Sequence, residues 1–253
     1  MKCKLIACEV LFREACATVA RSPHQVDVEF LPKGLHDIGG AGMCARLQEV
    51  VDRNDPLGYQ FILLGYALCG GGAAGLQARQ TPLVIPRAHD CITLLMGSRD
   101  RYRDYFTHHG GVYFASTGWL ERGQGIDQRV LAQTRERTGA GWTLEELIAK
   151  YGEDNGRYLY DEFNRYEKAY QRLTFIRTGL EPDGRFEDQA RANAQSHGWE
   201  FELIEGDLRI VQALAEGRWD DPSNAADFAI LRPGERLAPS YQDDIFRILP
   251  PDA

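Results

Sequence analysis

Short apolar segments that favour β-strands alternate with amphipathic segments that favour α-helices in the first half of the chain. The expected strands are Lys4–Leu11, Val26–Leu31, Phe61–Leu64 and Leu83–Pro86. The expected helices are Phe12–Ala20, Met43–Asp52, Ala73–Arg79, Cys91–Met96 and Arg99–Phe106. Two parallel strands need a crossover between them, and a helix usually supplies it. The alternation therefore predicts an α/β fold with a mainly parallel, doubly wound sheet.

The second half of the chain repeats this pattern. Its expected strands are Val112–Ser116, Leu173–Arg177, Trp199–Ile204 and Phe228–Leu231. Its expected helices are Thr143–Tyr151, which opens with a capping box, Glu153–Gln171, Phe186–Ser196 and Leu208–Ala215. No linker rich in Ser, Gly or Pro separates the two halves. We therefore expect two closely packed Rossmann-like lobes, residues 1–111 and residues 112–253, with ligands bound at the carboxyl ends of the strands.

The overall charge and hydropathy exclude several classes of partner. The 253 residues include 37 acidic and 29 basic side chains, for a net charge of −8, and the basic ones form no cluster that would bind nucleic acid. No apolar run approaches the roughly 18–20 residues that span a membrane. The N-terminal run MKCKLIACEVL lacks a cleavage site and has the pattern of a strand, so we expect a cytoplasmic protein.

All six cysteines lie within the first 91 residues. In a reducing compartment, this distribution indicates thiol or metal chemistry more than disulfide bonding. Cys8 lies near the end of the first expected strand, Cys69 follows the third strand, and His89 and Cys91 follow the fourth. Because the carboxyl ends of parallel strands meet at one edge of a sheet, these side chains are expected to converge there.

Thiolates and imidazoles are the ligands that zinc prefers. We therefore predict a metal site formed by Cys69, His89 and Cys91, with Cys8 as fourth ligand. Cys69, His89 and Cys91 alone would leave one position open, which is typical of a catalytic zinc ion, and binding of Cys8 would close the site in the resting state. In the alternative interpretation, Cys8 and Cys69 are buried as small apolar side chains and His89 hydrogen-bonds to a loop.

The glycine run Gly70-Gly71-Gly72 follows the third strand, and together with Gly75 it fits the pattern G-x-G-x-x-G. A dinucleotide site requires this pattern after the first strand, with an acidic residue at the end of the next one, and neither condition is met. We therefore favour a tight turn that leaves room for a substrate beside Cys69 and offers backbone N–H groups to an anion.

Charged residues around the His89–Cys91 segment have two interpretations each. Arg87 and Arg99 are expected either to hold a carboxylate or phosphate group or to form surface ion pairs. Asp90 is expected either to orient His89 or, as we favour, to cap the following helix. Glu9 and Glu14, which follow Cys8, are expected either to act as an acid or base near the site or, as we favour, to lie on a solvated helix face.

Trp119 and Glu121 follow the expected strand Val112–Ser116, so both are placed at a sheet edge. Trp119 is expected either to close the pocket or, as we favour, to pack in the core, and Glu121 is expected to supply a carboxylate. The expected site contains three catalytic residues, Cys69, Asp90 and Glu121. It holds its substrate or cofactor through Gly70, Gly71, Gly72, Arg87, Arg99 and Trp119.

Several segments resemble the DUF1638 family, bacterial and archaeal proteins that are defined only as a domain of unknown function. They are IACEVL, LGYALCGGGAAGL, VIPRAHDCITLLMGSR, VYFASTGWLE, YGEDNGRYLYDEF, LTFIRTG and WEFELIEGDL, which cover nearly the whole chain. Members look like companions of corrinoid-dependent methyl-transfer systems. His89-x-Cys91 with a distant cysteine is also similar to the zinc site of the corrinoid:thiol methyltransferases, in which zinc presents a thiolate nucleophile.

The expected function is that of a zinc-dependent enzyme that activates a small thiol or similar nucleophile for group transfer, with methyl transfer as the favoured reaction. Its partners would be a small-molecule substrate and a corrinoid protein. The alternative is a non-catalytic protein that binds or delivers a metal or cofactor for a corrinoid or iron–sulfur partner, with an iron–sulfur cluster or a corrinoid in place of zinc. A third interpretation, an NAD-type enzyme, rests on the glycine pattern alone.

Overall fold

The structure is a computed structural model that describes residues 1–122, 142–163, 170–240 and 244–251. Its larger sheet has the strand order β2-β1-β3-β4-β8. These strands are β1 (Lys2–Cys8), β2 (Gln25–Leu31), β3 (Phe61–Gly65), β4 (Leu83–Pro86) and β8 (Phe228–Leu231). The first four are parallel and β8 runs antiparallel to β4. The predicted α/β fold with a mainly parallel sheet is confirmed.

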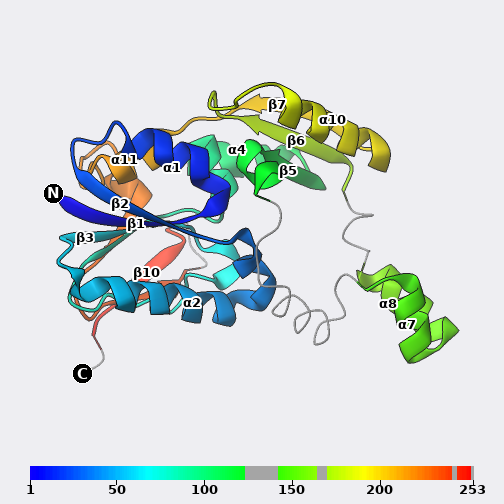
Figure 1. The fold of residues 1–253 in the computed structure, drawn as a ribbon, viewed down its shortest axis with the longest axis horizontal. Helices are drawn as coiled ribbons and strands as arrows, with labels where there is room; N and C mark the ends of the chain where they lie inside the picture. Colours follow the sequence, from blue (N-terminus) through cyan, green and yellow to red (C-terminus); the bar gives the residue numbers. More distant parts are fainter. Residues whose placement is uncertain (123–141, 164–169, 241–243, 252–253) are drawn as a thin grey trace.

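Helices cover both faces of this sheet, as Figure 1 shows. They are α2 (Gly39–Asn54) on one face, and α1 (Phe12–Val19) and α11 (Arg209–Ala215) on the other. Successive strand residues face opposite sides of a sheet, and accordingly Ile6 packs in the core beside α2 while Leu5 packs in the core beside α1 and α11. The sheet is therefore doubly wound.

A second, smaller sheet has the order β5-β6-β7, and all three strands are parallel. They are β5 (Val112–Ser116), β6 (Arg172–Arg177) and β7 (Glu200–Glu205). Helix α10 (Arg185–His197) packs on this sheet through Phe186, Ala190 and Ala194. Two helices connect the first sheet to the second, between β4 and β5: α3 (Cys91–Met96) and α4 (Arg99–His108). A third helix, α5 (Thr117–Glu121), follows β5 directly. The structure as a whole is a Rossmann-like α/β arrangement of two sheets flanked by helices.

The C-terminal part of the chain departs from the expected division at residues 111 and 112. After β7 the chain returns to the first sheet, where it forms α11 and β8. It then forms a hairpin of β9 (Arg236–Pro239) and β10 (Phe246–Leu249), which the sequence did not predict. Residues 112–253 are therefore shared between the two sheets.

The prediction of a helix over Ala73–Arg79 is wrong. Gly75 has a φ of +99°, and its N–H donates to the carbonyl of Leu237. The backbone of Leu76 and Ala78 also bonds to the β9 segment, and Gln77 forms a bridge with Arg236. Residues 73–75 form a turn, and residues 76–78 pair with a distant part of the chain instead of continuing as a helix.

Other boundaries differ less. The first strand ends at Cys8 and continues as a 3₁₀ turn, η1 (Glu9–Leu11). The further 3₁₀ turns are η2 (Lys33–Ile38), η3 (Asp55–Leu57), η4 (Cys69–Gly71) and η5 (Ala225–Asp227). The capping box at Thr143 opens α7 (Leu144–Tyr151), as predicted. The expected helix Glu153–Gln171 begins as α8 (Glu153–Phe163), and residues 164–169 lie outside the described part.

Helices α7 and α8 pack on each other, and Figure 1 shows the pair standing away from both sheets. Across the described residues, no helix combines the length and apolar character that crossing a membrane requires.

Candidate functional site

The thiols lie at the point where the winding of the larger sheet changes direction. The chain leaves β1 towards β2 on one side, and β3 lies on the other side of β1. In doubly wound sheets with this order, the carboxyl ends of such a strand pair diverge and leave room for a ligand. Cys8 is the last residue of β1, and Cys69 lies four residues after the end of β3. Both therefore lie at the usual ligand position of such a sheet.

Backbone hydrogen bonds hold the loops after β3 and β4 together. The N–H of Leu68 donates to the carbonyl of Ala88 at 3.0 Å, and the N–H of Cys69 donates to the carbonyl of His89 at 2.8 Å. The expected convergence of these two loops is thus present. Cys8 and Tyr66 are buried in the core beside α2, and Cys69, Cys91 and Trp119 pack against the same core.

The loop at Cys69 is a tight left-handed turn. Cys69 has a φ of +48°, and Gly70 and Gly71 have φ angles of +65° and +94°. A non-glycine residue in this conformation costs roughly 1–2 kcal/mol, and such strain is often found at functional sites. No helix follows the turn, so the structural context of a dinucleotide fingerprint is absent from this described segment.

The three thiols are uncharged at neutral pH. Burial raises the pKa of Cys8 to about 11 and that of Cys69 to about 12, and it raises the pKa of Cys91 well above its ordinary value. The neighbouring Cys8 adds to the rise in the pKa of Cys69 and of Cys91. The three thiols are therefore near enough for the charge of one thiolate to raise the pKa of its neighbours.

An imidazole also lies here, and it is His36 instead of the predicted His89. Its Nε2 atom is 4.0 Å from Cys8 Sγ, and burial lowers the pKa of His36, so the ring is neutral at pH 7. His36 lies on η2, directly after β2. Since β2 neighbours β1, the sheet-edge argument that selected Cys69 would also have found this residue.

His89 does not join the thiols. Its side chain is exposed, stacks on Tyr102 with 5.7 Å between ring centroids, and lines a different cavity. Asp90 caps α3, as favoured from the sequence, by accepting a hydrogen bond from the N–H of Thr93. Its carboxylate also accepts a hydrogen bond from Tyr102 Oη at 2.8 Å. Within the described ranges, no three Cys, His, Asp or Glu side chains already stand at the spacing that holds a metal ion.

The Tyr66 hydroxyl is buried beside the Cys8 thiol. The side chain is 1% exposed, and in the described part of the chain its Oη atom has no oxygen or nitrogen partner. Burial, followed by the nearby Cys8 and Cys69, raises the pKa of Tyr66 well above its ordinary value. A thiol is a weak hydrogen-bond partner, so a stronger acceptor beside Cys8 would stabilise this buried hydroxyl. Sequence reasoning missed Tyr66 because it lies in an apolar run.

A cavity of about 670 Å³ opens beside the thiols. Cys69, Cys91, His36, Asp90 and Gly70 form the wall from the first sheet. The remaining wall is mainly aromatic and includes Tyr102, Phe106, Tyr113, Phe114, Trp119 and Tyr170. We call this space the thiol cavity; both sheets contribute to it.

Trp119 lies in the wall of the thiol cavity and also packs against the core beside α2. Its Nε1 donates to Tyr113 Oη at 3.0 Å. The Lys33 ammonium lies 4.3 Å from the centre of a Trp119 ring and donates to the Trp119 carbonyl at 3.2 Å. Lys33 thus links η2 of the first lobe to α5 of the second.

Glu121, the last residue of α5, lies outside the wall of the thiol cavity. Arg13 donates to its two carboxylate oxygens from Nε at 2.9 Å and from Nη2 at 2.7 Å, and the resulting ion pair lowers the pKa of Glu121. This pair joins α5 to α1, and Glu121 does not line the thiol cavity. The prediction that Glu14 faces solvent is also wrong, since Glu14 is only 1% exposed and accepts a hydrogen bond from Thr178.

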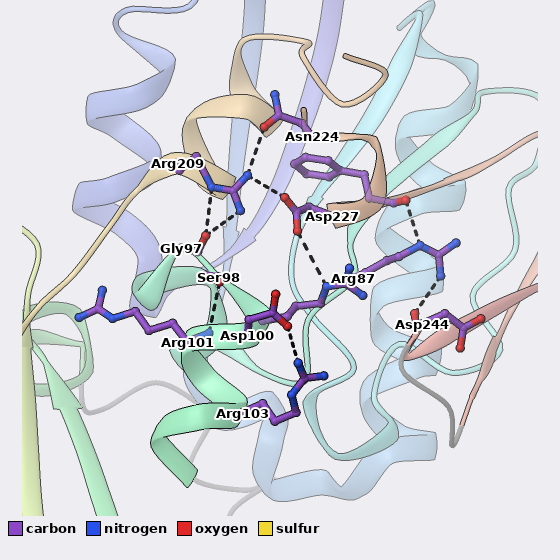
Figure 2. A network of polar contacts seen from close by, with 12 residues as sticks. Arg87, Gly97, Ser98, Asp100, Arg101, Arg103, Arg209, Asn224, Asp227 and Asp244 are labelled. Carbon is purple, nitrogen blue, oxygen red and sulfur yellow. Dashed lines mark hydrogen bonds and ion pairs between the residues drawn. The ribbon is translucent and has the colours of Figure 1, made fainter. Parts of the chain in front are cut away.

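The two predicted arginines line a second cavity, of about 1150 Å³. Arg87 donates from Nε and Nη1 to three backbone carbonyls, those of Phe228, Asp244 and Phe246. Arg99 Nε lies 3.8 Å from a carboxylate oxygen of Asp227. Figure 2 shows this network around Arg87, Asp227 and Asp244. We call this space the arginine cavity; Tyr102 and Phe106 line both cavities.

Comparisons with known proteins give a family but no activity. Residues 30–215 match a family model described as "Protein of unknown function (DUF1638)". No match was found among curated proteins or among solved structures. The matched range includes η2 with His36, the Cys69 turn, Cys91 and Trp119. Because the match covers well over half of the sequence, the chain belongs to the DUF1638 family.

Proposed function

We propose that this protein binds a zinc-class cation at its thiol cluster and uses it to activate a small thiol or similar nucleophile for group transfer, with methyl transfer as the favoured reaction. The observation that carries the proposal is the grouping of Cys8, Cys69 and Cys91 with the buried Tyr66 hydroxyl at the ligand position of the sheet.

The donor set fits this class of metal. Thiolate sulfur and neutral imidazole nitrogen are typical zinc ligands, and His36 supplies the imidazole in place of His89. The thiols must lose their protons when a metal binds, so binding releases protons and weakens at acid pH. Since the described side chains do not yet stand at ligand spacing, binding requires them to move.

The chain's own residues assist in two ways. The Lys33 ammonium lowers the pKa of Cys8 and so favours its thiolate against the effect of burial. The aromatic wall that includes Trp119 and Tyr113 excludes water from a bound substrate. A bound zinc ion would supply Lewis acidity, which lowers the pKa of a coordinated thiol.

A second candidate follows from the number of donors. If Cys8, His36, Cys69 and Cys91 all bind, four ligands fill a tetrahedral site and leave no position for a substrate. Such a closed site would suit a protein that carries a metal, or a cofactor such as an iron–sulfur cluster or a corrinoid, for a corrinoid or iron–sulfur partner. A coloured purified protein would favour this alternative.

We propose that the protein acts in the cytoplasm, where its six thiols, none of which forms a disulfide bond, would stay reduced. Its partners there would be a small-molecule substrate and a corrinoid protein, with no part for nucleic acid.

Elemental analysis of the purified protein tests the proposal. We expect about one zinc-class ion per chain in the wild type, and loss of most of it in Cys69→Ala and His36→Ala. The matched controls are Cys16→Ala, which removes an exposed thiol, and His89→Ala, which removes an exposed imidazole. Both controls should keep the metal. A wild type without stoichiometric metal, or variants that all retain it, would overturn the proposal.

A further inference from the structure

Aromatic rings form much of the wall of the thiol cavity, and one of them is open to solvent. Phe106 on α4 lines the cavity and is 41% exposed. Its ring centroid lies 4.5 Å from that of Tyr102 and 5.5 Å from that of Phe114, and both of these rings line the cavity as well. A row of rings left open in a cavity wall favours a ligand that covers it.

The charge in this wall is negative. Among the described residues that line the thiol cavity, Asp90 has the only charged side chain, because the lowered pKa of His36 leaves that ring neutral. Asp90 Oδ1 accepts a hydrogen bond from the N–H of Thr93 at 3.1 Å, and Oδ2 accepts one from Tyr102 Oη at 2.8 Å. These bonds fix the carboxylate without neutralising it, and no Lys or Arg of the described residues forms an ion pair with it. A carboxylate beside aromatic rings attracts a cation and repels an anion.

Lys33 already places a cation against one of these rings. Its ammonium lies 4.3 Å from the centre of a Trp119 ring. Burial lowers the pKa of Lys33, and the nearby carboxylates of Asp37 and Glu9 act against this effect, so acidic groups offset the charge of Lys33. Lys33 itself is not part of the cavity wall. The rings beside Asp90 therefore remain available to a second cation.

We propose that the thiol cavity binds a small organic cation through a methylated ammonium group, held by Asp90 and the rings of Tyr102, Phe106 and Phe114. Such a group is weakly hydrated and has few N–H donors to satisfy, so it suits a wall of rings better than a primary ammonium does. The volume of about 670 Å³ is in the range of small-molecule sites.

This inference names a class of ligand for the cavity of the proposed function. Binding of the cation requires no metal, and only its use as a substrate for group transfer rests on the proposed function. A bound metal would not oppose it, because the charges of three thiolates outweigh the charge of one divalent ion.

Calorimetric titration with choline tests the proposal. The neutral comparison is the alcohol in which a tert-butyl group replaces the trimethylammonium group of choline, since it has the same shape without the charge. We expect choline to bind, and the alcohol to bind at least about tenfold more weakly. The affinity for choline should be the same before and after treatment of the protein with a chelator, so a failure of the metal proposal leaves this test intact.

Two variants separate the carboxylate from the rings. Asp90→Asn removes the charge and keeps an oxygen that can cap α3, and it should weaken choline binding about tenfold. Phe106→Leu keeps an exposed apolar side chain and removes the ring. It should weaken choline binding about threefold or more, and change the binding of the neutral alcohol less than about twofold.

The matched control is Asp188→Asn, which removes the same charge from an exposed position on α10 outside the cavity wall. It should change the affinity for choline less than about twofold. Circular dichroism verifies that each variant is folded, and Phe106→Leu decides the test if Asp90→Asn fails to fold. The proposal is overturned if the wild type does not bind choline, binds it only with metal present, or binds the alcohol as tightly. It is also overturned if neither Asp90→Asn nor Phe106→Leu weakens choline binding more than Asp188→Asn does.

Discussion

Tyr66 and Glu14 both bury a side-chain oxygen that has no oxygen or nitrogen partner in the described part of the chain. Tyr66 packs in the core beside α2 together with Cys8. Glu14 lies between α1 and the end of β6, where Thr178 Oγ1 donates to its other carboxylate oxygen at 3.0 Å. The buried Glu14 carboxyl has a consequence for stability.

Burial raises the pKa of Glu14 above the ordinary value of 4.5. The folded state therefore favours the protonated carboxyl. Its contribution to stability is fully present below pH 4.5 and is lost as the pH rises through the higher pKa of the folded state. A folded-state pKa that lies one pH unit above the unfolded-state pKa corresponds to about 1.4 kcal/mol.

Glu14→Gln replaces the titrating group by a neutral one of the same shape. We expect the variant to gain on the wild type in free energy of unfolding as the pH rises from about 4.5 to 8, because only the wild type must ionise a buried carboxyl. Urea denaturation of both proteins across this range measures the difference. A constant difference at all pH values would show that Glu14 titrates normally.

At the scale of elements, the contact between α5 and η1 fixes the aromatic wall of the thiol cavity. A Cβ atom at Gly118 would lie 1.8 Å from the carbonyl oxygen of Val10, so the two backbones meet where only glycine fits. Val10 follows Cys8 by two residues, and Trp119 follows Gly118 directly. The contact thus connects the thiol side of the cavity to its aromatic side.

Gly118→Ala should lower the free energy of unfolding by about 3 kcal/mol, because the new methyl group forces backbone segments apart. The control is Gly110→Ala, at an exposed position where a Cβ would meet no atom within 4 Å. It should change stability by less than about 0.5 kcal/mol. Equal urea midpoints for the two variants would contradict the described contact.

Local sequence patterns predicted elements well where the structure depends on local interactions. The four parallel strands and the caps at Asp90 and Thr143 agree with the prediction, because periodicity and capping act over a few residues. The helix predicted over Ala73–Arg79 was wrong because Gly75 and its neighbours bond to β9, which is far away along the chain. The short strands β9 and β10 were missed for the same reason.

The candidate site was also predictable only in part. Strand order brings Cys8, Cys69 and Cys91 to one sheet edge, and this was predictable from the alternation of strands and helices. The His89 ring stacks on Tyr102, which lies on α4. The spacing of His89 and Cys91 in the sequence does not predict this orientation of the side chain.

At the scale of the whole molecule, the two sheets meet around the thiol cavity. Arg13 and Glu14 on α1 bond to Glu121 and Thr178 of the second lobe, and the N–H of Asp207 donates to the carbonyl of Leu95. Figure 1 shows the second sheet on the same side of the larger sheet as α1. The cavity is therefore complete only when both sheets are in place.

Zinc-edge X-ray absorption spectroscopy of the zinc-loaded protein tests whether the thiols and His36 bind the metal. We expect sulfur ligands at about 2.3 Å and an imidazole nitrogen at about 2.0 Å. The nitrogen signal should be lost in His36→Ala and kept in His89→Ala. A metal shell of oxygen and nitrogen atoms without sulfur would contradict the assignment of the thiols of Cys8, Cys69 and Cys91 as ligands.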